Sequence, residues 1–91
     1  MKPSHIYPGA NALNPYITIK GCSEAIDFYK NAFDAKETLR LLMPNGQIGH
    51  AEIEIEGSLI MLAEENLEWG NKSPHTIGGN PMTFGLYVVD V

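Results

Sequence analysis

Residues 49–56, in the middle of the chain, alternate between apolar and polar side chains. The apolar positions are Ala51, Ile53 and Ile55, and the polar positions are His50, Glu52, Glu54 and Glu56. A period of two residues is typical of a strand with one buried face and one open face. The chain is therefore expected to build a sheet whose open face carries a histidine and several carboxylates.

Apolar patterns and turn signals predict the other elements of one βαβββ unit. A strand is predicted over residues 15–20, followed by a helix that Ser23 caps and that ends near Asp34. The apolar stripe of this helix consists of Ile26, Tyr29 and Phe33. Further strands are predicted over residues 37–43, 49–56 and 59–63, with turns at residues 44–47 and 57–58. The predicted fold class is α+β.

The turn at Gly57-Ser58 predicts how the last two strands pair. A two-residue turn there places Glu54 opposite Met61 and Ile53 opposite Leu62. Directly opposed residues share one side of a sheet. The apolar face, which is expected to pack under the helix, then contains Ile53, Ile55, Ile60 and Leu62. The open face contains His50, Glu52, Glu54, Leu59 and Met61.

The chain divides into three predicted parts. Residues 1–63 form an irregular arm and the βαβββ module, and residues 64–82, rich in glycine, asparagine and proline, form a linker. Residues 83–91 are predicted to be the first strand of a truncated second module. An unpaired apolar strand at a terminus is an aggregation hazard that proteins usually cover. We therefore expect the natural protein to continue beyond Val91.

Composition narrows the classes of partner. The formal net charge is -5, the sequence pI is about 5.0, and the six basic residues are scattered, which argues against a nucleic-acid backbone as partner. No apolar run approaches the roughly 20 residues that span a bilayer, and residues 1–12 lack the apolar core of a secretory signal. The single cysteine, Cys22, cannot form an internal disulfide. A cytoplasmic protein without a membrane or nucleic-acid partner is predicted.

The element order, the linker and the extra strand resemble the vicinal oxygen chelate superfamily of glyoxalases, bleomycin-resistance proteins and extradiol dioxygenases. The residues that carry the resemblance to its glyoxalase-like, or demethylubiquinone-methyltransferase-like, branch are Asn14-Pro15-Tyr16-Ile17, Ala25-Ile26-Asp27-Phe28-Tyr29, Phe33, His50-Ala51-Glu52-Ile53, Leu59-Ile60-Met61-Leu62-Ala63-Glu64-Glu65 and Phe84-Gly85-Leu86-Tyr87-Val88. The resemblance implies that the chain is the N-terminal module, half of a curved mixed sheet around a cavity.

The resemblance also bears on metal binding. Metal-dependent members use a His or Gln on the first strand, a Glu on the fourth strand and two ligands from the second module. The corresponding positions here are Asn14, Met61 and Thr83. An amide, a thioether and a hydroxyl are poor ligands for a borderline divalent ion. No metal and no cofactor are therefore predicted, although a second module with His and Glu at its ligand positions would favour a divalent metal.

The resemblance implies that the open face lines the cavity, joined by Asn14, Tyr16 and Thr18 of the first strand. His50 and Glu52 are the candidate catalytic residues, because a carboxylate two positions away can orient an imidazole as a general base. The candidate substrate-binding residues are Asn14, Tyr16, Glu54, Met61 and Trp69.

Alternatives stay open for several of these residues. His50 can equally be a polar or ligand-contacting residue without a chemical role. Glu54 and Glu56 can be the solvated face of a half-buried sheet. Trp69 can be an aromatic lid or an anchor that holds the linker against the sheet. Cys22 precedes a helix, where a thiol can be activated, but it also fits a small buried hydrophobic residue.

Three functions compete. The first is a glyoxalase-like enzyme that transfers protons on a small oxygenated molecule at His50 or Glu52. The second is a bleomycin-resistance-type protein that binds a ligand without catalysis, for which acidic cavity walls favour a cationic ligand. The third is a structural dimer that pairs through residues 83–91. A homodimer is expected in each case. A dimeric ferredoxin-like barrel is the architectural alternative.

Overall fold

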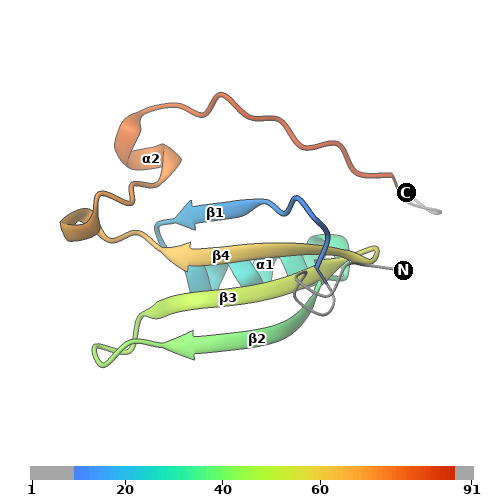
Figure 1. Ribbon diagram of the computed structural model, residues 1–91, viewed down its shortest axis with the longest axis horizontal. Coiled ribbons are helices and arrows are strands. Elements are labelled where there is room, and N and C mark those ends of the chain that lie inside the picture. The colour runs from blue at the N-terminus through green and yellow to red at the C-terminus, as the bar shows by residue number, and fades with distance from the viewer. Residues whose placement is uncertain (1–9, 88–91) are drawn as a thin grey trace.

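The computed structural model describes residues 10–87 and has an α+β fold with the order βαβββ at its centre (Figure 1). Four strands form one mixed sheet in the order β1-β4-β3-β2. The strands are β1 (Tyr16–Ile19), β2 (Lys36–Leu42), β3 (Ile48–Ile55) and β4 (Ser58–Glu64). Strand β1 runs parallel to β4, whereas β2, β3 and β4 form antiparallel pairs. The predicted fold class is confirmed.

Helix α1 (Cys22–Phe33) covers one face of the sheet (Figure 1). The core beneath it centres on Ile26, Ile53 and Leu62, each with 0% of its surface exposed. Ile55 is buried and Ile60 packs against the same cluster, so the predicted apolar face is confirmed. The residues that α1 buries at its two ends differ from the predicted stripe of Ile26, Tyr29 and Phe33. Cys22 is fully buried, whereas Phe33 is 43% exposed because it lies in the last turn, beyond the core.

The start of α1 corrects the predicted cap. Gly21 is the N-cap, in a left-handed conformation with φ 80°, and Ser23 already lies inside the first turn. The backbone amides of Gly21 and Cys22 each donate a hydrogen bond of 2.9 Å to the Glu64 carboxylate at the end of β4. A carboxylate at a helix N-terminus satisfies free amides and suits the helix dipole. The cap therefore comes from a residue far away in the sequence, and the local pattern missed it.

The β3–β4 turn also corrects a prediction. Its two central residues are Glu56 and Gly57, with φ 49° and 82°, as a two-residue hairpin requires. The observed register pairs Glu54 with Leu59 and Glu52 with Met61. The turn thus lies one residue earlier than predicted, and every pair shifts by two positions. A shift of two keeps each side chain on its predicted face.

The segment after β4 contains more structure than the predicted linker. A 3-10 helix, η1 (Leu67–Trp69), and a short helix, α2 (Pro74–Ile77), follow the strand. Glu65 accepts hydrogen bonds from the backbone amide and hydroxyl of the buried Ser73, at 2.9 and 3.1 Å, which ties α2 to the end of β4. The described residues include no helix long and apolar enough to cross a membrane.

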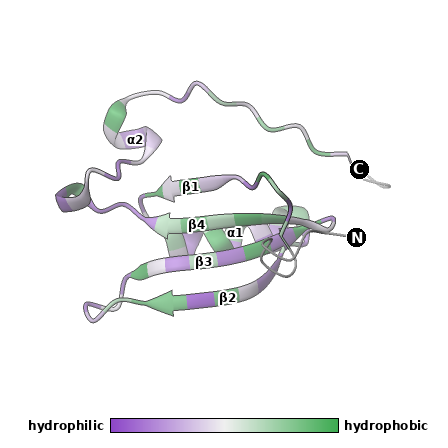
Figure 2. Cartoon of the chain, in the orientation of Figure 1, coloured by the Kyte–Doolittle hydropathy of each residue, from purple (hydrophilic) through white to green (hydrophobic). Residues whose placement is uncertain are grey.

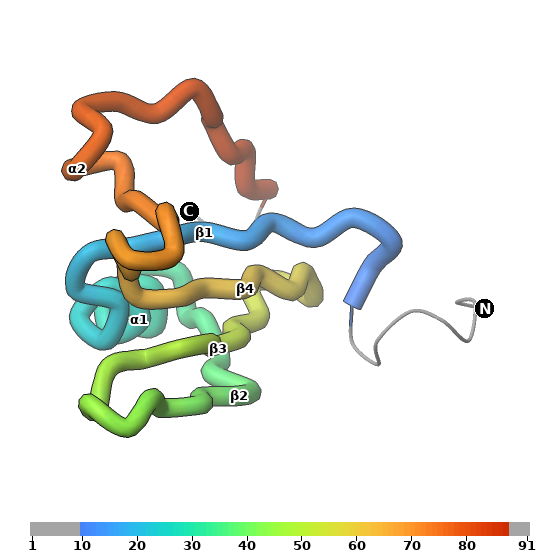
Figure 3. Tube along the Cα trace, turned by 60° about the vertical axis from the view of Figure 1, so that its left-hand side comes forward, coloured from blue at the N-terminus to red at the C-terminus, as the bar shows by residue number. Residues whose placement is uncertain are grey.

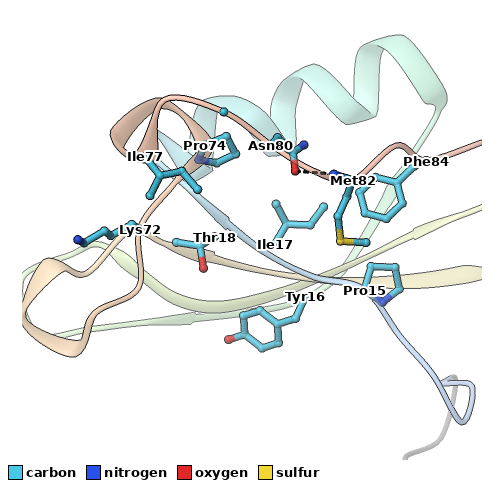
Figure 4. A pocket seen from close by; sticks show the side chains of 11 residues that line it. Pro15, Tyr16, Ile17, Thr18, Lys72, Pro74, Ile77, Asn80, Met82 and Phe84 are labelled. Atoms are coloured by element: carbon cyan, nitrogen blue, oxygen red, sulfur yellow. Dashed lines mark hydrogen bonds between the residues drawn. The ribbon is translucent and has the colours of Figure 1, made fainter.

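The C-terminal segment runs back beside β1, as two views show (Figure 1, Figure 3). Residues 83–87 form no strand, contrary to the prediction for this part of the chain, and residues 88–91 of the predicted strand lie outside the described residues, as do residues 1–9 of the predicted arm. Ile17, Met82 and Phe84 point into the space between this segment and β1 (Figure 4).

Candidate functional site

The sheet face opposite α1 carries the polar side chains of β3. Polar and apolar residues alternate along this strand (Figure 2). In the register of the sheet, Tyr16 of β1 lies next to Met61 of β4, which lies next to Glu52 of β3. His50 lies two residues from Glu52 and so shares its face. Residues from β1 and β3 can therefore meet above β4.

A chain of two hydrogen bonds joins three of the predicted residues. The Tyr16 hydroxyl lies 3.0 Å from Nδ1 of His50, and Nε2 of His50 lies 2.9 Å from Oε2 of Glu52. The Tyr16 and His50 rings are tilted by 49° with centroids 5.5 Å apart. The three side chains belong to two strands with β4 between them. The predicted pairing of His50 with Glu52 is thus present, and Tyr16 joins it.

The chemistry of the three groups determines which atom donates and which accepts in each of the two hydrogen bonds. An ionised carboxylate only accepts hydrogen bonds, so the proton between His50 and Glu52 belongs to Nε2. Nδ1 of a neutral His50 then has a lone pair, and Nδ1 accepts a hydrogen bond from the Tyr16 hydroxyl. Glu52 is only 6% exposed, and the bond from His50 offsets part of its loss of water.

Tyr16 is the solvent-exposed end of this series of hydrogen bonds, because Tyr16 is 54% exposed while Glu52 is buried. Partial burial raises the pKa of the Tyr16 phenol, and the negative charge that Cys22 carries when it is ionised raises it further. The phenol therefore stays protonated at neutral pH. A molecule on the open face would meet a neutral hydroxyl that is backed by an imidazole and a buried carboxylate.

The remaining predicted residues occupy different places. Met61 is half-buried between Tyr16 and Glu52 on the open face. Glu54 is half-buried on the same face, opposite Leu59 and Lys36. The structure thus brings both residues next to the hydrogen-bonded chain, as a site on this face requires.

Asn14 and Trp69 are not part of the hydrogen bonds that join Tyr16, His50 and Glu52. The Asn14 side chain bridges to the backbone of Asn11, accepting from its amide at 2.9 Å and donating to its carbonyl at 2.6 Å. Its amide therefore holds the turn before β1. Trp69 lies in η1 with 66% of its surface exposed. Such exposure does not fit an anchor against the sheet, and a role as a lid stays a prediction.

Two residues of the open face were missed by the sequence patterns. Leu39 pairs with Glu52 and Leu41 pairs with His50 across the β2–β3 ladder. An irregularity between Glu37 and Leu39 shifts the register of β2. Such a bulge moves residues to the other face, and no local signal marks it here. These two leucines give the polar site an apolar border.

Among residues 10–87, no three His, Cys, Asp or Glu side chains gather as a metal site would need. At the positions that the resemblance assigns to metal, the Asn14 amide is engaged with Asn11 and Met61 offers a thioether. Those donors do not fit a divalent ion.

A cavity of about 280 Å³ lies between β1 and the segment from Lys72 to Phe84 (Figure 4). Tyr16 borders it, but its ring extends away from Ile17, Met82 and Phe84 (Figure 4). The Tyr16 hydroxyl therefore belongs to the open face of the sheet and not to this cavity.

No family model matches the chain. An uncharacterized protein of Mycobacterium bovis is 41% identical over 83 residues, which are 88% of this chain and 55% of that protein. Uncharacterized proteins from two strains of Mycobacterium tuberculosis match with the same identity over 49% of their length. The chain thus spans about half the length of the curated relatives it matches.

Proposed function

We propose that the chain is part of a glyoxalase-like enzyme of the vicinal oxygen chelate superfamily, and that Tyr16, His50 and Glu52 transfer a proton to and from a small oxygenated molecule. The observation that carries this proposal is the continuous hydrogen-bond chain from the exposed Tyr16 hydroxyl through His50 to the buried Glu52. A relay of this kind needs an accessible outer group and a shielded inner charge.

The reaction step follows the direction of the hydrogen bonds. A C–H or O–H bond of the bound molecule breaks, and its proton goes to the Tyr16 oxygen. Tyr16 at the same time passes its own proton to Nδ1 of His50, which becomes an imidazolium beside the Glu52 carboxylate. The reverse transfers return a proton to another atom of the molecule, which completes an isomerisation or prepares an elimination. Tyr16 is neutral before and after each step, in keeping with its raised pKa.

The test is hydrogen exchange from solvent. The protein would be incubated in D₂O with hydroxyacetone, dihydroxyacetone and the hemithioacetal of methylglyoxal and glutathione, and deuterium uptake at carbon followed by NMR. General acid–base groups typically contribute about 10²- to 10⁴-fold. We therefore expect Tyr16→Phe and His50→Gln to slow the exchange at least about 100-fold. The matched control is His75→Asn, an exposed histidine of α2.

Exchange by the native protein that survives in Tyr16→Phe would contradict the proposal, as would no exchange with any of the three compounds. A ligand-binding protein of the bleomycin-resistance type would then be favoured. Its supporting observation is the half-buried Glu54 carboxylate on the face that also exposes the Tyr16 ring. Binding of the cationic bleomycin that weakens in Glu54→Gln, measured by calorimetry, would support this second function.

We also propose a homodimer in the cytoplasm. Strand β2 is an edge of the sheet, and its Leu41 and Leu42 are 54% and 61% exposed. Exposed apolar side chains on an edge strand favour association with another chain. The single cysteine, which is buried and free, agrees with a reducing compartment. Sedimentation velocity would show a dimer that Leu41→Lys weakens, and a monomer at all concentrations would contradict this arrangement.

A further inference from the structure

A second cavity lies on the helix side of the sheet, where the end of α1 meets the β3–β4 turn. Its volume is about 470 Å³. Its lining includes Tyr29 and Phe33 of α1, and Phe84 and Leu86 of the C-terminal segment. Ile17 of β1 and Ile60 of β4 also line it. The chain itself bounds the cavity on two sides, so the space is concave.

The lining of this cavity is apolar and uncharged. Among its lining residues in the part of the chain that the structure describes, none carries a formal charge, and the polar groups are those of Asn11, Ser58 and the Tyr29 hydroxyl. Burying an ion in such a lining is unfavourable unless a group of opposite charge pairs with it. The lining therefore selects against charged ligands.

The aromatic wall suits a flat ligand. The Tyr29 and Phe33 rings are stacked with an interplanar angle of 29° and centroids 6.3 Å apart. Phe33, Phe84 and Leu86 are 43%, 56% and 46% exposed, so apolar surface remains at the cavity wall for a ligand to cover. Small-molecule sites typically measure about 300–1,000 Å³ and combine apolar walls with a few polar groups. A cavity of roughly 150 Å³ already holds benzene.

We propose that this cavity binds a neutral, apolar small molecule with an aromatic or similarly flat body. The site lies on the opposite side of the sheet from the Tyr16–His50–Glu52 chain, although Leu59 of the open face borders it at the turn. It is therefore independent of the proposed proton transfer, and its ligand is not the substrate of that reaction.

The probe for this site is N-phenyl-1-naphthylamine, a neutral fluorophore that brightens in apolar surroundings. We expect saturable binding with one probe per chain. Phe33→Ala removes one aromatic wall and should weaken binding about five- to tenfold. Gly85→Leu should weaken it at least as much, because Gly85 lines the cavity without a positive φ and an added Cβ meets nothing within 4 Å. The side chain is therefore added without backbone strain and without a clash at its Cβ.

The matched control is Phe28→Ala. Phe28 is 59% exposed and contacts the Phe33 ring edge-on at 6.1 Å, but it does not line the cavity. Its affinity for the probe should stay within about twofold of the native value. Tyr16→Phe should likewise leave the affinity unchanged, which separates this site from the proton-transfer site.

Three outcomes would overturn the inference. The first is a loss of affinity in Phe28→Ala equal to that in Phe33→Ala, which would mean that exposed rings bind the probe non-specifically. The second is tighter binding of the anionic analogue 1-anilinonaphthalene-8-sulfonate than of the neutral probe. The third is the absence of saturable binding of the neutral probe to the native protein.

Discussion

The Tyr16 hydroxyl lies 3.0 Å from Nδ1 of His50, although 34 positions separate the two residues in the chain. The parallel pairing of β1 with β4 brings them together, because it places Tyr16 level with Met61 and therefore one strand away from β3. The outer residue is open to a ligand, and the inner residue is held by a buried carboxylate. This contact extends the hydrogen-bonded pair of His50 and Glu52 to an exposed hydroxyl.

Removing the inner carboxylate should destabilise the protein. In Glu52→Ala the Nε2–H of the half-buried His50 loses its acceptor, and we expect the free energy of unfolding to fall by about 1–3 kcal/mol. Urea unfolding followed by circular dichroism measures the change. The control is Glu54→Ala on the same face, for which about 0.5 kcal/mol or less is expected. Equal losses in the two variants would show that the bond to His50 adds no stability.

The link between Glu64 and the start of α1 gives a second prediction. Glu64→Ala leaves the amides of Gly21 and Cys22 without their acceptor and should cost about 1–2 kcal/mol of stability. Glu68→Ala in the exposed η1 is the control, with little change expected. The same urea unfolding measurement compares them. A Glu64→Ala protein as stable as Glu68→Ala would show that water replaces the carboxylate at this helix end.

The pKa of the Cys22 thiol is raised to about 11, first by burial and then by the Glu64 carboxylate. The thiol is therefore protonated and shielded at neutral pH, and we expect iodoacetamide to label it only after unfolding. Since the folded pKa lies above the ordinary value of 9.0, the contribution of this thiol to stability is complete below about pH 9. It should be lost as the pH rises from there towards 11. Mass spectrometry of iodoacetamide labelling from pH 7 to 10 checks whether the folded protein protects the thiol. Rapid labelling of the native protein at pH 7 would contradict this protection.

The β3–β4 turn offers a stabilising substitution. Glu56 has φ 49°, a left-handed conformation that asparagine adopts more readily than glutamate, and Gly57 follows it. Glu56→Asn creates the favoured Asn-Gly turn and should raise the stability by about 0.5–1 kcal/mol. The melting temperature measures the effect, with Glu54→Asn in the preceding strand β3 as the control. A lower melting temperature for Glu56→Asn would mean that the glutamate side chain has a role in this turn.

The periodicity of residues 49–56 predicted the strand, its two faces and the pairing of His50 with Glu52, because all three depend on local alternation. Local alternation does not predict features that depend on residues far apart in the sequence. Glu64 replaces a local cap at α1, and the irregularity near Thr38 brings two leucines to the open face without any local signal. The family resemblance placed Tyr16 on the correct face, but its contact with His50 depends on the register of β1 against β4.

The hydrogen-bond chain can be tested directly by long-range ¹H–¹⁵N NMR of the His50 ring at about pH 8.5, where imidazoles are ordinarily neutral. The structure predicts that Nε2 carries the proton and that Nδ1 accepts a hydrogen bond. In Tyr16→Phe the tautomer should persist while the Nδ1 resonance moves toward that of the exposed His75. A proton on Nδ1, or an Nδ1 resonance that Tyr16→Phe leaves unchanged, would contradict the relay from Tyr16 to Glu52.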